Sequence, residues 1–362
     1  MQYQIINTCG TSVLTNPARD DKALSEMLTK YSNAKTSSTI PKDVYEKVQE
    51  HWGHLIEEWG AKSEDEARKS SAEINCLLTW QHKNKIENKD CFCYLIHTDT
   101  VFGDLAAQLV EEWLVANKYQ GVQLQKIESL NTDNLLSFEN GLSHLAKWAF
   151  ELKNSDTYSQ FIFNIAGGFK SVSGFTQVLG TFLADTTIYK FEGGNEVLEV
   201  PKLPIVWGET EAIRNNFDLY RKVSLGVPLD TYSILNPLWV KNGRFTPWGQ
   251  IAWENAKKII YKEQVYRSVY EDVKVTDGFM ESVENLKDGS RIWLINERID
   301  DLIAFKMSNG KHNFRRLDYK RVLGSHPYTH ECDAWADGSA KRIYCNEREG
   351  KIFVEILGNS LH

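Results

Sequence analysis

The sequence predicts an α/β protein with three parts: a Rossmann-like, doubly wound parallel sheet, a helical winged-helix-like connector and a C-terminal α+β domain. Three observations predict it. Short apolar runs alternate with segments of helical periodicity over about the first two hundred residues. A stretch rich in turns and aromatic residues follows, and the chain then closes with three strand-like runs. We place the domains at residues 1–205, 206–264 and 265–362.

The first domain is predicted to contain short strands separated by helices. The run Phe161–Ile165 is apolar except for Asn164, which is typical of a strand buried on both faces. Strands are expected at Gln2–Cys9, Cys91–Ile96, Val122–Ile127, Phe161–Ile165 and Thr187–Phe191. Helices are expected at Asp21–Lys30, Pro41–Gly60, Ser63–Trp80, Asp104–Asn117, Asn131–Leu152 and Phe169–Leu183, with a closing hairpin at Glu192–Trp207.

Polar turns follow three of these strands, at Asn7–Ser12, His97–Thr100 and Asn164–Ser171. In a doubly wound sheet, ligands bind beyond the carboxyl ends of the strands, where the strand order reverses. The third turn contains a Gly-Gly pair, and Lys170 and Ser171 then open a helix whose free N–H groups attract an anion. The stretch lacks both the Walker A and the G-x-G-x-x-G patterns, so an ordinary turn beside a surface lysine remains open.

The connector is predicted to hold short helices and a hairpin with the sequence VKNGRFT. This arrangement would suit a small winged helix. Its basic residues Lys241, Arg244, Lys257 and Lys258 are candidates for contact with nucleic acid. The alternative is a rigid spacer or a dimerisation element.

The C-terminal domain is predicted to combine helices with an antiparallel sheet. Helical periodicity covers Phe279–Leu286 and Arg291–Phe305. Strand-like runs follow at Tyr328–Trp335, Lys341–Asn346 and Lys351–Leu357, with a hairpin turn at Glu347–Gly350.

A basic segment lies between the helices and the strands. Lys306–Arg321 contains six basic residues and one acid, a local charge of +5 in a chain of net charge -7. Such a patch in an acidic protein is the natural place for an RNA backbone, and a solvated surface is the alternative. The candidate RNA-binding residues are Lys311, His312, Arg315, Arg316, Lys320 and Arg321.

Histidines and cations near the last strands are candidates for metal-independent cleavage of RNA. This reaction needs a base for the 2′-hydroxyl, an acid for the leaving 5′-oxygen and cations for the charged transition state. Histidine transfers protons near neutral pH, whereas lysine and arginine supply charge. The candidates are His326, His330, Asp333, Lys341, Arg342 and His362.

Two other nuclease patterns occur in the same domain. Arg321 and His326 match R-x4-H, the pair of all-helical HEPN ribonucleases, but Gly324 and Pro327 disfavour the helix that this pair needs. Glu349-Gly-Lys351 matches the E-x-K of metal-dependent nucleases, but it falls at a predicted hairpin turn, where polar residues are expected.

The amino-acid composition and net charge exclude several classes of protein. The net charge of -7 argues against a protein that coats nucleic acid by charge alone. The six cysteines show no metal-ligand spacing and are expected to be core thiols in a reducing compartment. There is neither a signal peptide nor an apolar run of membrane-spanning length, so we expect a cytoplasmic protein without a membrane partner.

The first two hundred residues resemble a CARF domain, the sensor of cyclic oligoadenylate in type III CRISPR defence. The resemblance rests on IINTCGTS, on the turn after CFCYLI and on NIAGGFKS, which is similar to the N-x-x-G-G-F-K signature of the family. It implies a homodimer that binds its cyclic ligand across the twofold axis. The implied ligand-binding residues are Asn7, Thr8, Gly10, Thr11, Ser12, His97, Thr98, Asn164, Gly167, Gly168, Lys170 and Ser171.

The last hundred residues resemble a RelE/YafQ-type toxin, a small ribonuclease that cuts mRNA in the ribosomal A site. The resemblance lies in the order of helices, basic segment and strands, with THECDAW, KRIY and the terminal ILGNSLH. It implies that His326, His330, Asp333 and His362 act in cleavage, with Arg342 or Lys341 binding phosphate. The final Gly and His are four residues apart here, instead of two, which puts the role of His362 in doubt.

Together the two resemblances imply a ribonuclease that cyclic oligoadenylate activates, with cyclic tetra-adenylate expected from the match of a twofold dimer to a fourfold ring. We expect it to cleave ribosome-bound mRNA without a metal and so inhibit translation. Because the protein is acidic, a contact with the ribosomal stalk is the hypothesis for recruitment. The alternatives are a ligand-responsive CARF winged-helix transcription regulator, or a CARF effector with HEPN-type or metal-dependent nuclease chemistry.

Overall fold

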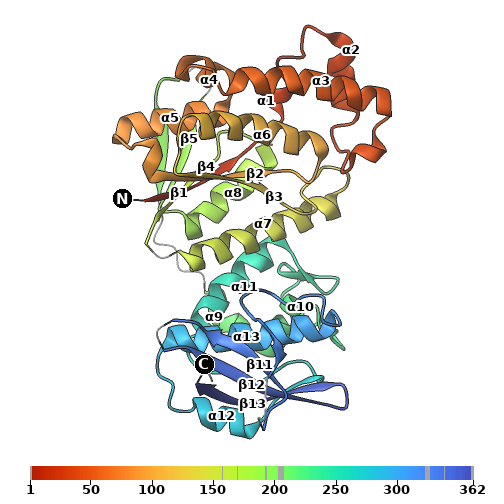
Figure 1. Ribbon diagram of the computed structural model, residues 1–362, viewed down its shortest axis with the longest axis vertical. Helices are drawn as coiled ribbons and strands as arrows, with labels where there is room; N and C mark the ends of the chain where they lie inside the picture. The colour runs from red at the N-terminus through yellow and green to blue at the C-terminus, as the bar shows by residue number, and fades with distance from the viewer. Residues whose placement is uncertain are drawn as a thin grey trace. The chain divides into compact units, whose positions relative to one another are not determined.

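The computed structural model describes residues 2–156, 158–168, 170–191, 194–202, 208–322, 327–337 and 339–359, and for Lys170 and Ser171 it describes the backbone. The chain divides into two compact units, Met1–Val206 and Trp207–His362 (Figure 1). Each unit has a sheet and a hydrophobic core of its own.

The first unit contains a six-stranded sheet with the order β3-β2-β1-β4-β5-β6. Neighbouring strands from β3 to β5 are parallel, and β6 pairs antiparallel to β5. This topology confirms the predicted doubly wound sheet, and the order reverses between β1 and β4. The strands are β1 (Tyr3–Thr8), β2 (Cys91–His97), β3 (Gly121–Lys126), β4 (Gln160–Asn164), β5 (Thr186–Lys190) and β6 (Val197–Pro201).

Helices cover both faces of this sheet (Figure 1). One face carries α1 (Ser12–Thr15), α2 (Lys22–Lys30), α3 (Lys42–Trp59), α4 (Glu64–Ser70), α5 (Ala72–Asn84) and α6 (Val101–Ala116). The other face carries α7 (Leu135–Ser155) and α8 (Lys170–Leu183). The helix predicted over Ser63–Trp80 is two helices, because Ser71 has an extended backbone and its hydroxyl caps α5 by accepting from the Ile74 N–H.

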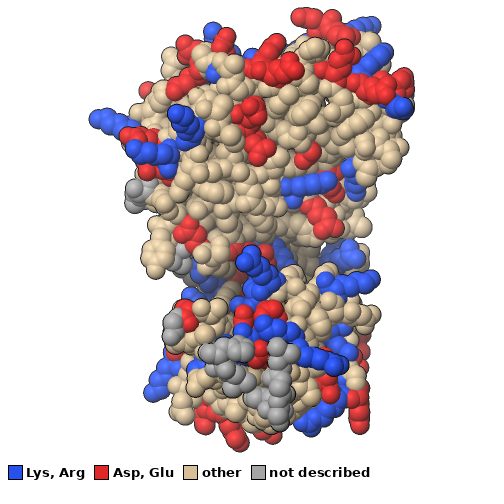
Figure 2. Space-filling model, viewed as in Figure 1, with Lys and Arg blue, Asp and Glu red and all other residues tan. Residues whose placement is uncertain are grey.

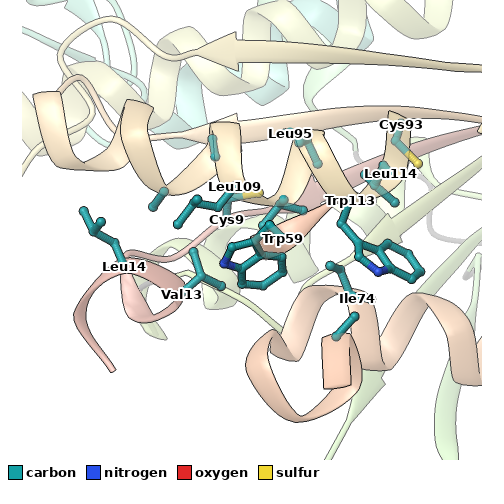
Figure 3. Close-up of a cluster of buried hydrophobic side chains, with 14 of the residues drawn as sticks. Cys9, Val13, Leu14, Trp59, Ile74, Cys93, Leu95, Leu109, Trp113 and Leu114 are labelled. Atoms are coloured by element: carbon teal, nitrogen blue, oxygen red, sulfur yellow. The ribbon is translucent and has the colours of Figure 1, made fainter. Parts of the chain in front are cut away.

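The core on the α3, α5 and α6 side is continuous from the sheet to the outer helices. Figure 3 shows the indole rings of Trp59 on α3 and Trp113 on α6 within this cluster, beside Cys9, Leu95 and other buried side chains. Both indoles are almost fully buried, and each such ring removes a large apolar area from water. The packing fixes α5 against the carboxyl ends of β4 and β5.

Two expectations about the whole chain were tested. All six cysteines are buried, unpaired thiols, as predicted. In the part of the chain that the structure describes, no helix combines the length and the apolar composition that crossing a bilayer requires.

The second unit contains a five-stranded sheet with the order β10-β11-β12-β13-β9. The three predicted strands are β11 (His330–Trp335), β12 (Lys341–Arg348) and β13 (Lys351–Asn359), and they pair antiparallel as expected. Two short edge strands, β9 (Val273–Val275) and β10 (Lys320–Arg321), were not predicted. The helices α12 (Asp277–Val283) and α13 (Gly289–Met307) contribute to the core on one side of this sheet, which confirms the α+β class.

The same unit begins with the predicted connector. It holds α9 (Glu209–Arg214), α10 (Phe217–Leu225), the hairpin of β7 (Val240–Lys241) and β8 (Arg244–Phe245), and α11 (Pro247–Ile260). Asn242 and Gly243 both have positive φ, as a two-residue hairpin turn requires, so the VKNGRFT hairpin is confirmed.

Buried charges join the connector helices to α13. Arg221 on α10 donates to Asp300 on α13 through Nε at 2.8 Å, and Tyr261 beside α11 donates its hydroxyl to the same carboxylate. The Arg221 side chain is fully buried. Lys257 on α11 is paired with Glu297 on α13 at 2.5 Å and is 16% exposed, so it belongs to this buried network.

Candidate functional site

The first candidate site lies at the carboxyl ends of β1 and β4, where the strand order reverses. The helices between β1 and β2 pack on one face of the sheet, whereas α8 after β4 packs on the other (Figure 1). The segments that follow β1 and β4 therefore diverge beyond Thr8 and Asn164. The loops that leave these strands are the two glycine-containing loops predicted to bind ligand.

Two asparagines tie these loops together beneath the surface. Asn164 donates from Nδ2 to Asn7 Oδ1 at 2.9 Å and to the Glu73 carbonyl at 2.8 Å. Both asparagines are buried and directly opposite in the β1–β4 register. Since their amides are occupied inside the protein, they position the loops instead of facing a ligand.

The loop backbones approach each other closely above this pair. The Thr8 hydroxyl donates to the Gly167 carbonyl at 2.7 Å. A Cβ on Gly10 would lie 3.0 Å from the Gly168 nitrogen, and Gly168 has a φ of +84°. Both glycines are therefore required by the geometry, one by close approach and one by its backbone conformation.

A carboxylate that the sequence did not single out occupies the space between the loops. Glu73, at the start of α5, accepts from the Gly10 N–H through Oε1 at 2.8 Å and from the Ser71 hydroxyl through Oε2 at 2.8 Å. It is 1% exposed, and a Cβ on Gly167 would lie only 2.1 Å from Oε1. An acidic side chain thus already uses a backbone donor of the predicted anion site.

The protonation of Glu73 is shifted by its surroundings. Burial raises the pKa of its carboxyl above the ordinary value, and the hydrogen bonds from Gly10 and Ser71 lower it by less. Because this buried carboxyl lies between the two glycine loops, the binding of a charged ligand there would depend on the charge of Glu73.

The predicted ligand-binding residues fall into two groups. Asn7, Thr8, Asn164 and Gly167 are buried, whereas Gly10, Thr11, Ser12 and Gly168 reach the surface. The surface group therefore presents the backbone and hydroxyl groups that a ligand would contact. Lys170 and Ser171 begin α8 directly after this loop, as predicted, and their side chains lie outside the described atoms.

His97 and Thr98 lie at the end of β2, and both are buried. His97 Nδ1 is 3.1 Å from the Thr98 carbonyl, and Thr98 and Thr100 share a hydroxyl hydrogen bond of 2.9 Å at the start of α6. Burial lowers the pKa of His97, so the imidazole is neutral at neutral pH. In the described residues, no hydrogen bond joins His97 or Thr98 to the two glycine loops.

The second candidate site lies on the C-terminal sheet. Arg342 on β12 donates from Nη1 to Glu331 Oε1 at 2.8 Å, and its Nη2 is 3.2 Å from Asp333 Oδ1. Glu331 and Asp333 are two apart on β11 and therefore project to the same face. Sequence reasoning selected Asp333 and Arg342 but missed Glu331, although this two-residue spacing was a signal that could have found it.

His330 projects to the opposite face of β11. It alternates with Glu331 and shares its face with the core residue Cys332. Its ring stacks on Tyr319 with centroids 5.1 Å apart, and its Nε2 is 3.8 Å from Glu347. Burial lowers the pKa of His330, more than Glu347 raises it. The structure therefore separates His330 from Asp333 and Arg342.

Lys341 is the remaining described candidate. It donates from Nζ to Asn359 Oδ1 at 2.5 Å across the β12–β13 pair, beside Arg342. His326 and His362 lie outside the described residues.

The basic segment is partly neutralised by one acid within it and by another on α13. Arg316 makes two hydrogen bonds to Asp301 on α13, at 2.9 and 2.7 Å, and Lys320 is paired with Asp318. Lys311, His312, Arg315 and Arg321 are exposed. On the face of this unit that Figure 2 shows, Lys and Arg side chains are interspersed with Asp and Glu.

The two rival nuclease patterns have clear local structures. Arg321 belongs to strand β10, whereas the R-x4-H pair needs a helix. Glu349 and Gly350 both have positive φ and form the two-residue turn between the paired residues Arg348 and Lys351. Within the described ranges, no group of three His, Cys, Asp or Glu side chains is arranged to hold a metal ion.

Residues 68–203 match a family model described as CRISPR-associated protein (Cas_APE2256). The matched range contains Glu73 and the loop from Asn164 to Gly168, but neither β1 nor any of the second unit. The similarity supports a CRISPR-related role for this chain.

Proposed function

We propose that this protein is a cyclic oligoadenylate-activated ribonuclease of type III CRISPR defence. The first unit would be the CARF sensor and the second unit the RelE-like effector, which cleaves ribosome-bound mRNA. The observation that carries the proposal is the convergence of the Gly10 and Gly168 loops at the switch point of the sheet. The CRISPR-associated match over residues 68–203 supports a CRISPR-related role and covers part of the first unit alone.

The sensor proposal rests on the chemistry of these loops. A cyclic oligoadenylate carries one phosphate per nucleotide, and backbone N–H groups at a glycine loop bind phosphate well. Thr11, Ser12 and Gly168 lie at the surface and would present such groups, whereas the Gly10 N–H already donates to Glu73. A homodimer would bring two copies of the site to one ring, which favours cyclic tetra-adenylate as the activator.

The effector proposal rests on the face of the C-terminal sheet that carries Arg342. In the proposed reaction, a carboxylate of Glu331 or Asp333 takes the proton of the 2′-hydroxyl, and the 2′-oxygen attacks the adjacent phosphorus. The bond to the 5′-oxygen breaks, a general acid protonates that oxygen, and a 2′,3′-cyclic phosphate remains. Arg342 would stabilise the additional negative charge of the transition state, as paired guanidinium groups do at phosphoryl centres.

The test is cleavage of one mRNA in a translating extract and as naked RNA, each with and without cyclic tetra-adenylate. EDTA is added to one arm of each to test the proposed independence from metal. Cutting that needs both the ligand and the ribosome supports the whole proposal, including a recruiting contact such as the ribosomal stalk. Ligand-dependent cutting of naked RNA would retain the sensor and refute the ribosome requirement.

The Arg342→Ala variant is the matched negative control for the effector half. Loss of cutting with retained ligand binding places the chemistry in the second unit. Absence of cutting in every arm would refute the ribonuclease proposal.

A further inference from the structure

A second polar cavity lies in the first unit, beside the cavity that contains Gly168. It has a volume of about 760 Å³, and its chemistry is set by Arg68, Asn75, Thr79, His82, Lys83 and Lys190. Arg68 comes from α4, four of the others come from α5, and Lys190 is the last residue of β5. The cavity therefore lies at the carboxyl edge of the sheet, on the face that carries α5.

Two cations converge on one hydroxyl at the inner end of this cavity. Arg68 Nη1 donates to Thr79 Oγ1 at 2.9 Å, and Lys190 Nζ donates to the same oxygen at 3.0 Å. The two charged nitrogens are thus less than about 6 Å apart. Like charges at this separation repel each other, and both side chains are only partly exposed, which weakens screening by water.

In the described residues no carboxylate pairs with Lys190, whereas Arg68 has one long ion pair, with Glu64, and Glu196 also lines the cavity. The other partner of Lys190 is the neutral amide of Asn75, whose Oδ1 accepts at 3.0 Å. The carboxylate of Glu64 is 3.9 Å from Arg68 and only 3.2 Å from His82 Nε2. His82 Nδ1 in turn accepts from Arg68 Nη2 at 3.2 Å.

Thr79 can accept no further donor, whereas the cations still have donors to give. The Thr79 hydroxyl donates its proton to the Asn75 carbonyl at 2.7 Å, and the Arg68 and Lys190 donors fill its two lone pairs. An ammonium group has three N–H donors, and the described contacts of Lys190 use two. A tetrahedral oxyanion beside Arg68 and Lys190 would accept these donors and remove the repulsion.

We propose that this cavity is an anion site that binds the phosphate group of a small phosphate monoester of about mononucleotide size. Arg68 and Lys190 bind the phosphate, and the rest of the cavity holds the organic part. The volume is within the range of small-molecule sites and exceeds what inorganic phosphate fills. The site does not include the Gly10 and Gly168 loops themselves, but Asn75 and Lys190 also line the cavity that contains Gly168.

Isothermal titration calorimetry with adenosine 5′-monophosphate as the probe tests the site, in chloride buffer without phosphate or sulfate. Inorganic phosphate and adenosine are run as separate probes. We expect saturable binding of the monophosphate to the wild-type chain, weaker binding of inorganic phosphate and none of adenosine. Lys190→Gln should weaken binding at least tenfold, and Lys190→Arg should restore most of it.

The matched control is Lys83→Gln, because Lys83 lines the same cavity but is 58% exposed and already paired with Glu199 at 2.7 Å. This control should bind within about twofold of the wild type. Melting temperatures show that each variant is folded. The proposal is overturned if the wild-type chain does not bind the monophosphate at millimolar concentration, or if Lys190→Gln binds it as the wild type does.

Discussion

Replacing Gly167 by alanine tests the geometry of the corner between the two glycine loops. The new Cβ would lie 2.1 Å from Oε1 of Glu73 and 2.3 Å from its Cγ, so the carboxylate must move. It would lose its hydrogen bonds to the Gly10 N–H and the Ser71 hydroxyl. Because each hydrogen bond to a charged group contributes about 1.5–3 kcal/mol, we expect the free energy of unfolding of this unit to fall by about 3 kcal/mol or more.

The matched control is Gly174→Ala. Gly174 lies inside α8, and a Cβ there would meet no atom within 4 Å. This exposed helical site should gain about 0.5–1 kcal/mol from alanine. Urea unfolding followed by hydrogen exchange of peptides from β1 and β4 measures both variants and reports on the first unit alone.

A double variant identifies the clash. In a Glu73→Ala background the carboxylate is gone, so Gly167→Ala should be at least about 2 kcal/mol less destabilising than in the wild type. If Gly167→Ala has the same effect in both backgrounds, or no more effect than Gly174→Ala, then Glu73 does not occupy this corner and the reasoning fails.

Four further predictions concern charged residues of the two units. Glu73→Gln should bind cyclic tetra-adenylate at least tenfold more tightly by calorimetry, because a negative charge about 6 Å from a phosphate is unfavourable by about 3 kcal/mol at an effective dielectric constant of about 20; equal affinity would contradict this. Since the folded pKa of Glu73 is raised, the wild-type chain should also lose stability relative to this variant as the pH rises above 4.5, in urea unfolding measured across pH. Arg342→Ala should abolish RNA cleavage, whereas His330→Ala, which alters the opposite face of β11, should retain it in the same extract assay; the reverse result would move the chemistry to His330. Asp300→Asn should destabilise the second unit by about 3–5 kcal/mol in thermal unfolding, because it leaves the buried Arg221 without a counter-charge, and a change below 1 kcal/mol would show that this ion pair is dispensable.

The doubly wound sheet was predictable because its signals are local. Runs such as Cys91–Ile96 are apolar throughout, and polar turns follow them directly, so the sequence alone placed both strand and loop. The short strands β9 and β10 carried no such signal. Three and two residues are too few for an alternating pattern, and these strands form because longer neighbours offer an edge to pair with.

The role of Glu73 was not predictable from periodicity. An acidic residue in the first turn of a helix is ordinarily solvated and favoured there by the helix dipole. Its burial arises from the approach of Gly10 and Gly167, which come from loops far away in the sequence. The local charge of the basic segment was also a poor guide to its surface, because a contact made only in the folded chain changes it. Asp301 on α13 neutralises Arg316.

The separation of the C-terminal catalytic candidates onto two faces of β11 could have been predicted from the sequence. His330 and Asp333 are three positions apart, and an odd spacing on a strand places two side chains on opposite faces. The sequence argument grouped them by proximity along the chain. Side chains alternate between the two faces of a strand. On the predicted strand this places His330 and Asp333 on opposite faces, and it places Glu331 on the face of Arg342.

The ion pair between Arg221 and Asp300 limits how this chain could have been assembled by gene fusion. A recombination event at residue 264 would transfer α13 without α10 and leave Asp300, a 9% exposed side chain, without its cation. A junction before α9 transfers both partners together. The unit that such an event would have to transfer whole is therefore Trp207–His362, and a transplanted effector that begins at the predicted domain boundary would inherit a destabilised core.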